Sequence, residues 1–196
     1  PSVIATVIIT SDKCYENVEW LWGYRENDRL GGKDPYSASK ACAELITKVY
    51  MESFFKENSP NIATTRAGNV IGGGDWALDR VVPDCVRAWS KGEKVEIRNP
   101  NATRPWQHVL EPLSGYLALG QKLFQGNPEL KNQSFNFGPQ AKVNQSVGDL
   151  ITEMAQHWPG AEWKFEQEMN SDKPESTLLK LNCDKALQLL QWNSVL

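Results

Sequence analysis

Two segments of the sequence carry residue types that could remove and return protons. Ser11, Asp12 and Lys13 are consecutive, and Tyr36 and Lys40 are four residues apart in a later segment. In a helix that spacing places Tyr36 and Lys40 on one face, one turn or about 5.4 Å apart. A lysine ammonium favours the charged phenolate of a neighbouring tyrosine, so the pair could act as a general base. A serine at a nearby strand end could then orient the substrate.

The Tyr-x-x-x-Lys spacing is weak by itself because the same residue types recur on many exposed helix faces. The elements around it make it more specific. Val3–Thr10 is a continuous β-branched and apolar run, which predicts a strand buried on both faces. Pro35 precedes a helical stripe that predicts a helix from Tyr36 to about Lys56. Asn61–Val70 predicts a second buried strand, followed by a glycine-rich turn.

The rest of the sequence continues the alternation of helix and strand. The predicted elements are a helix at Val81–Lys91, a strand at Val95–Arg98, a helix at Pro112–Phe124, a strand at Ser134–Phe137, a helix at Val147–His157 and a strand at Trp163–Phe165. No terminal helix is predicted at Leu187–Trp192. This order indicates an α/β fold with a mostly parallel sheet, whose ligands bind at the carboxyl ends of the strands.

Composition excludes several classes of function. The chain has 196 residues and a formal net charge of -3, and its basic residues are scattered, which argues against nucleic acid or an anionic membrane as partner. No run of about 18 apolar residues predicts a membrane span. The four cysteines are far apart and have no histidine cluster nearby, so we expect reduced thiols, no metal site and a cytoplasmic protein.

Three motifs resemble those of the extended short-chain dehydrogenases that act on nucleotide sugars. They are Thr-Ser-Asp after the first strand, Pro-Tyr-Ser-Ala-Ser-Lys at the helix start, and Arg-Ala-Gly-Asn-Val-Ile-Gly after the second strand. The resemblance implies NAD as cofactor. It also implies that Ser11, Tyr36 and Lys40 move the proton of a sugar hydroxyl and, with Ala67 and Gly68, contact the cofactor.

Asp12 and Lys13 indicate a particular reaction within this family. The 4,6-dehydratases carry two further acid/base residues after the serine or threonine, usually aspartate and glutamate, whereas 4-epimerases do not. The lysine here, with Gly-Gly-Gly-Asp-Trp and Arg-Pro-Trp-Gln-His-Val downstream, resembles the dehydratases that act on CDP-glucose. Asp12 would then protonate the leaving C6 hydroxyl, which requires a poorly solvated pocket. A neutral Lys13 would take the C5 proton, or a charged Lys13 would stabilise the enolate.

Further residues are expected to bind the nucleotide sugar. Arg104, beside the rigid Pro105, is suited to bidentate contact with a diphosphate. The resemblance extends this role to other positions. The predicted substrate-binding residues are Asn69, Arg80, Val81, Arg98, Arg104 and Asn136.

The same resemblance suggests how the chain is organised. We expect residues 1–78 to be the carboxyl-terminal half of a Rossmann-like NAD-binding domain, and residues 79–196 to be a smaller mixed substrate-binding domain with segments that return to the sheet. The glycine-rich amino-terminal half, about 120 residues, is expected to be absent from this chain. A homo-oligomer, dimer or tetramer, would form through the Tyr36 helix, on the face that bears Leu45 and Val49.

Other functions remain compatible with these motifs. A 4-epimerase or decarboxylase of the same family would share Ser11, Tyr36 and Lys40 without needing Asp12 beside Lys13. A non-catalytic NAD-binding relative would be expected to lose Tyr36 or Lys40, and both are present. For a dehydratase, the resemblance implies deoxysugar biosynthesis of the kind that supplies lipopolysaccharide O-antigen.

Overall fold

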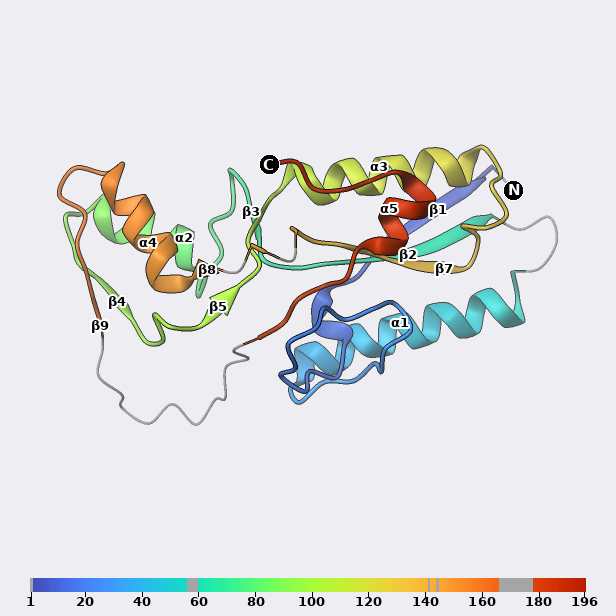
Figure 1. Ribbon diagram of the computed structural model, residues 1–196, viewed down its shortest axis with the longest axis horizontal. Coiled ribbons are helices and arrows are strands. Elements are labelled where there is room, and N and C mark those ends of the chain that lie inside the picture. Colours follow the sequence, from blue (N-terminus) through green and yellow to red (C-terminus); the bar gives the residue numbers. More distant parts are fainter. Residues whose placement is uncertain (1, 56–59, 141, 144, 166–177) are drawn as a thin grey trace.

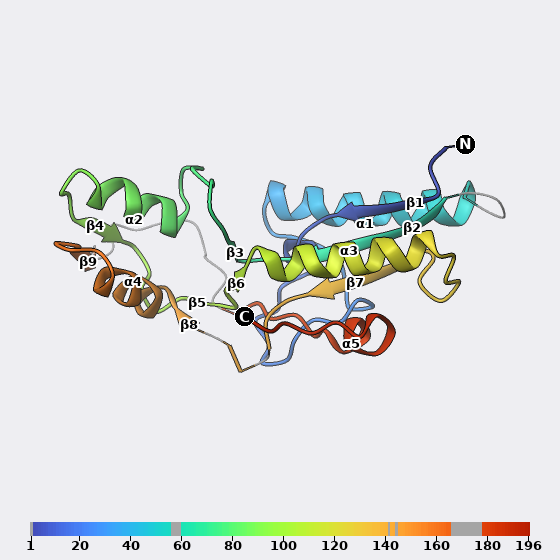
Figure 2. The same cartoon turned by 90° about the horizontal axis from the view of Figure 1, so that it is seen from above.

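The computed structural model describes residues 2–55, 60–140, 142–143, 145–165 and 178–196. Its centre is a three-stranded parallel sheet in the order β1 (Ala5–Ile9), β2 (Asn61–Ala67) and β7 (Gln133–Phe137). Helix α1 (Pro35–Ser53) covers one face and α3 (Leu110–Phe124) covers the other (Figure 1). Helix α5 (Asp184–Leu190) lies beside β7 (Figure 2). The predicted α/β fold with a parallel sheet is therefore confirmed.

A second group of elements lies beyond the carboxyl ends of these strands (Figure 1). Helices α2 (Val81–Trp89) and α4 (Val147–Gln156) pack with the parallel pair β4 (Val95–Ile97) and β9 (Trp163–Phe165). Two pairs of short strands complete this group and connect it to the sheet. They are β3 (Val70–Ile71) with β6 (Gln107–His108), and β5 (Thr103–Arg104) with β8 (Gln145–Ser146).

Each group has its own hydrophobic core. The core of the sheet lies between the strands, α3 and α5, and its members include Ala63, Leu119, Phe135, Phe137, Ala186, Leu190 and Trp192. The core of the second group contains Cys85, Trp89, Val95, Ile97 and Ile151. Chain segments after residue 79 thus return to the first sheet as α3, β7 and α5. The domain boundary at residue 78 stays a prediction.

Several element ends differ from the sequence prediction by one to three residues, and one predicted absence of a helix was wrong. The second strand stops at Ala67 because Asn69 has a φ of 53°, a left-handed conformation that breaks the extended chain before β3. Helix α1 ends at Ser53, and the predicted end at Lys56 lies outside the described residues. The expectation of no terminal helix was wrong. Residues 184–190 form α5, because Ala186 and Leu190 are buried in the core of the sheet.

Local capping explains where the two motif-bearing elements begin. Asp34 accepts a hydrogen bond from the Ser37 amide at 3.0 Å, and Pro35 occupies the first position of α1, where no amide is needed. After β1, the chain forms a single 3-10 turn, η1 (Asp12–Cys14), capped by the Ser11 hydroxyl. The capped first turns of α1 and η1 therefore place both predicted catalytic segments at one end of the sheet. Among the described residues, no helix is long and apolar enough to cross a membrane.

Candidate active site

A cleft of about 780 Å³ opens where the carboxyl ends of β1 and β2 meet the second group of elements. This volume is within the usual range of small-molecule sites. Most of the predicted site residues line it. They are Ser11, Asp12, Lys13, Tyr36, Ala67, Gly68, Asn69, Arg80, Val81, Arg98 and Arg104. Lys40 and Asn136 are not among its lining residues.

Ser11 and Asp12 form the buried floor of the cleft. They are 8% and 3% exposed, and the Ser11 hydroxyl donates to Asp12 Oδ1 at 2.9 Å. Burial raises the pKa of the Asp12 carboxyl, and the opposing charge of Lys13 and the hydrogen bond from Ser11 lower it only in part. Asp12 therefore lies in the poorly solvated environment that a carboxylic acid needs in order to donate a proton.

Gly68 makes the burial of Asp12 possible. A Cβ atom at residue 68 would lie 2.0 Å from Asp12 Oδ2 and 2.1 Å from its carboxyl carbon. Those separations are far below van der Waals contact. Only glycine at this position therefore lets the end of β2 cover the carboxyl group.

Tyr36 and Lys40 lie on the first two turns of α1, as the spacing predicted. The Lys40 ammonium is 5.6 Å from the centroid of the Tyr36 ring, close enough for a cation–π contact. Tyr36 is 54% exposed and lines the cleft, and Lys40 is half-buried beside it. Lys13 is also half-buried, so the cleft brings a phenol, an ammonium group and a buried carboxyl together.

The predicted substrate-binding residues divide into two sets. Asn69, Arg80, Val81, Arg98 and Arg104 line the cleft. The charge of Arg104 reaches Asp12, where it lowers the pKa of the carboxyl slightly. Arg98 is exposed and lies 4.0 Å from the Asp79 carboxylate.

Asn136 has a different environment. It is completely buried, its Oδ1 accepts from the Tyr15 hydroxyl at 2.7 Å, and its Nδ2 donates to the carbonyls of Tyr24 and Asn182. All the polar atoms of its amide are engaged inside the protein. This environment favours a structural role for Asn136 over the predicted contact with the nucleotide.

Sequence reasoning missed several residues near the site. Trp76 and Trp106 line the cleft, and Glu44 of α1 and Arg66 of β2 form a buried ion pair of 2.8 Å. One signal was available for the pair. Arg66 is an ionisable residue inside a strand that was predicted to be buried, and such a residue needs an opposite charge.

Comparison with known proteins identifies the family. Residues 4–138 match the NAD dependent epimerase/dehydratase family. The chain belongs to this family. It is 46% identical over 198 residues to the CDP-glucose 4,6-dehydratase of Salmonella typhimurium, an alignment that covers 98% of the chain and 54% of that protein. The chain thus spans about half the length of the curated relative that it matches.

Solved structures of low sequence identity share the fold of this family member. The UDP-glucuronic acid 4-epimerase of Bacillus cereus, solved with UDP-glucuronic acid and NAD, has a TM-score of 0.79 at 18% identity, covering 97% of this chain and 56% of that one. The dTDP-glucose 4,6-dehydratase of Bacillus anthracis, solved with NAD, has a TM-score of 0.74 at 19% identity, covering 97% and 56%. The Rossmann-type fold class is therefore confirmed.

The residues present fit one end of the cofactor that the family uses. An exposed tyrosine with a lysine ammonium beside its ring suits the hydroxyl groups of a ribose, and the tyrosine lines the cleft at the carboxyl ends of the strands, where dinucleotides bind. The sequence contains no Gly-x-Gly-x-x-Gly turn for the pyrophosphate. The fit therefore concerns a ribose of the cofactor.

Proposed function

We propose that the protein is a CDP-glucose 4,6-dehydratase, an NAD-dependent hydro-lyase that forms CDP-4-keto-6-deoxyglucose. One observation carries the proposal: the buried Asp12 carboxyl, with its raised pKa, lies in the same cleft as Tyr36. A 4-epimerase has no leaving group to protonate, so it does not require a buried acid in addition to the tyrosine. The 46% identity to a curated CDP-glucose 4,6-dehydratase supports this reaction and the cytidine base.

The proposed chemistry divides among the cleft residues. Bound NAD would supply the acceptor for hydride from C4 and the donor of that hydride to C6. Tyr36, assisted by Lys40 and Ser11, takes the proton of the C4 hydroxyl. The C4 ketone acidifies C5, and Lys13 either removes the C5 proton or stabilises the enolate while solvent takes that proton. A proton returns to C5 after C6 has received the hydride. Asp12 gives its proton to the C6 hydroxyl, which leaves as water.

Recognition of the nucleotide is proposed for the arginines that line the cleft. Arg104, Arg98 and Arg80 would bind the diphosphate and its surroundings, with Asn69 at the turn between β2 and β3. The proposed setting is deoxysugar biosynthesis in the cytoplasm, of the kind that supplies O-antigen sugars.

Product analysis tests the proposed reaction. We expect the full-length protein, supplied with NAD and CDP-glucose, to form a 4-keto-6-deoxy sugar nucleotide that is lighter than the substrate by one water. UDP-glucose, which differs from the substrate only in its base, and dTDP-glucose, which also lacks the 2'-hydroxyl of the ribose, should react at least about tenfold more slowly. A product of unchanged mass with an inverted C4 centre would establish the 4-epimerase alternative, and no conversion at all would favour a non-catalytic relative.

We also propose that α1 mediates self-association. Its outer face exposes Leu45, Ile46, Val49 and Tyr50, which are 50 to 58% exposed and line a shallow apolar hollow of about 210 Å³. A contiguous apolar surface of this kind is typical of a protein interface. We expect the full-length protein to sediment as a dimer or tetramer.

Substitution on that face tests the interface directly. Val49→Lys should shift the protein to monomer in sedimentation experiments, because it would bury a charge without a partner. Leu117→Lys is the matched control, since Leu117 is 75% exposed on α3, on the opposite face of the sheet. A parent protein that sediments only as monomer would refute the proposal.

A further inference from the structure

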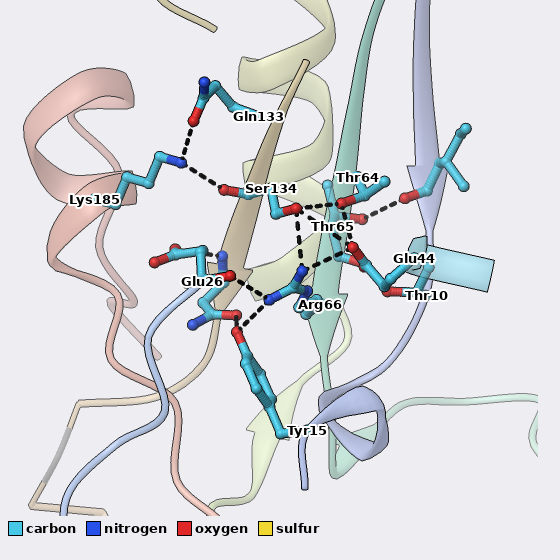
Figure 3. Close-up of polar contacts among 12 residues, drawn as sticks. Thr10, Tyr15, Glu26, Glu44, Thr64, Thr65, Arg66, Gln133, Ser134 and Lys185 are labelled. Atoms are coloured by element: carbon cyan, nitrogen blue, oxygen red, sulfur yellow. Dashed lines mark hydrogen bonds and ion pairs between the residues drawn. The ribbon is translucent and has the colours of Figure 1, made fainter. Parts of the chain in front are cut away.

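The interface between α1 and the sheet has a buried polar centre. The Glu44 carboxylate, 3% exposed, accepts hydrogen bonds from the hydroxyls of Thr10 at 2.5 Å and Thr64 at 2.8 Å (Figure 3). Arg66 Nη2 donates to the same carboxylate at 2.8 Å, and the Ser134 hydroxyl lies 3.3 Å from it. Glu44 is therefore bonded to residues of β2 and β7 and to the residue that follows β1.

Arg66 is held equally firmly on its other side. Its Nη1 donates to the Tyr15 hydroxyl at 2.8 Å and to the Glu26 carbonyl at 2.9 Å, and its guanidinium lies 4.9 Å from the centroid of the Tyr15 ring. Tyr15 follows η1 directly. The guanidinium thus links β2, the turn after β1 and, through Glu44, helix α1.

The ion pair is charged despite its burial. Burial by itself would raise the pKa of the Glu44 carboxyl, but the hydrogen bond and charge of Arg66, with the threonine hydroxyls, hold it below its ordinary value. Apolar side chains of similar size often serve stability as well as a buried ion pair does, so stability alone does not explain it. The directional hydrogen bonds of this pair favour a single orientation of α1 on the sheet.

The position of Glu44 connects that orientation to the proposed active site. Glu44 follows Lys40 by four residues and Tyr36 by eight, so the three share one side of α1 at intervals of about one turn. Thr10 directly precedes Ser11, and Arg66 lies two residues before Gly68, which covers Asp12. One carboxylate therefore ties together the three segments that carry the proposed catalytic groups.

We propose that Glu44 and Arg66 are positioning residues that fix Tyr36 and Lys40 relative to Ser11 and Asp12. The inference rests on the proposed function for its kinetic consequence alone. Neither residue lines the cleft, so neither is offered as a catalytic residue. A small displacement of α1 would separate the phenol from the strand ends, and misplacement by about 1 Å can cost about a hundredfold in rate.

The first test requires no substrate. In the full-length protein, Glu44→Gln should increase amide hydrogen exchange at residues 10–15 and 36–44 by about tenfold or more relative to residues 112–124 of α3. Glu52→Gln is the matched control, because Glu52 lies on the same helix with a side chain that is 63% exposed. Equal change in all three segments, or none, would overturn the proposal.

The second test measures rates. Glu44→Gln should lower kcat for CDP-glucose by about 10- to 100-fold with KM changed by less than about threefold. In a Tyr36→Phe background, the same substitution should change the residual rate by less than about threefold, because there is no phenol left to position. An equal loss in both backgrounds would show an effect on folding alone. If the parent protein does not convert CDP-glucose, the proposed function fails while the exchange experiment still decides this inference.

A milder variant covers the case in which Glu44→Gln does not fold. Thr64→Val keeps the shape of the side chain and removes the hydroxyl that lies within hydrogen-bond distance of the Glu44 carboxylate and the Ser134 hydroxyl, both at 2.8 Å. It should raise amide hydrogen exchange at residues 36–44 by about threefold to fivefold, because the loss of one hydroxyl weakens the polar centre while the ion pair remains. Unchanged exchange in this variant would also contradict the proposal.

Discussion

Full-length protein with Asp12→Asn should oxidise CDP-glucose at C4 but fail to release water. The first step is proposed to use Tyr36, Lys40 and Ser11, which the substitution leaves in place. The second step needs a proton for a hydroxide-like leaving group at C6, and an amide cannot supply one. Formation of the 6-deoxy product should therefore fall by about 10² or more.

A single-turnover experiment separates the two steps. Absorbance of the reduced cofactor should rise in Asp12→Asn and remain high, whereas in the parent protein it rises and then decays. Tyr36→Phe is the contrasting control, because it should prevent the first rise. Product formation by Asp12→Asn at the parent rate would exclude Asp12 as the acid and remove the main support for the dehydratase assignment.

The second large effect is expected at Lys40. Lys40→Ala should lower turnover at least about a hundredfold, because the ammonium beside the Tyr36 ring is proposed to assist proton transfer by Tyr36 and to bind the cofactor ribose. Steady-state rates with CDP-glucose, together with affinity for NAD measured by calorimetry, would separate the two contributions.

Matched substitutions make the Lys40 result specific. Lys48→Ala removes an exposed lysine from the same helix, two turns further along, and should leave turnover within about twofold of the parent. Lys40→Arg keeps the charge and should retain more activity than Lys40→Ala. Near-normal turnover in Lys40→Ala would exclude Lys40 from the site.

Local features of the sequence were sufficient to predict much of the fold and part of the candidate site. Alternating strand and helix patterns predicted the parallel α/β fold, and the four-residue spacing of Tyr36 and Lys40 predicted their contact on α1. The order of the motifs placed Ser11, Asp12 and Gly68 at neighbouring strand ends, where the structure has them. These features depend on residues close together in the chain, so periodicity and spacing reveal them.

Other features depend on residues that are distant in the chain, and only the tertiary structure decided them. The sequence suggested that Asp12 needs a poorly solvated pocket, but the burial of its carboxyl group depends on Gly68, which is 56 residues later in the chain. Helix α5 is stabilised by packing against β7 and α3 rather than by a strong pattern of its own. Asn136 turns inward because Tyr15, Tyr24 and Asn182 satisfy its amide.

The Glu44–Arg66 pair shows most directly why the sequence alone does not determine such contacts. A charged residue in a buried strand or on the inner face of a helix must have a partner, and the sequence therefore indicates that some partner exists. It does not say which, because the partner is chosen by how α1 lies across the strands. Composition and spacing thus determined the chemical groups of this protein and the elements that carry them, while packing between distant segments determined which groups are buried, which are paired and which face the cleft.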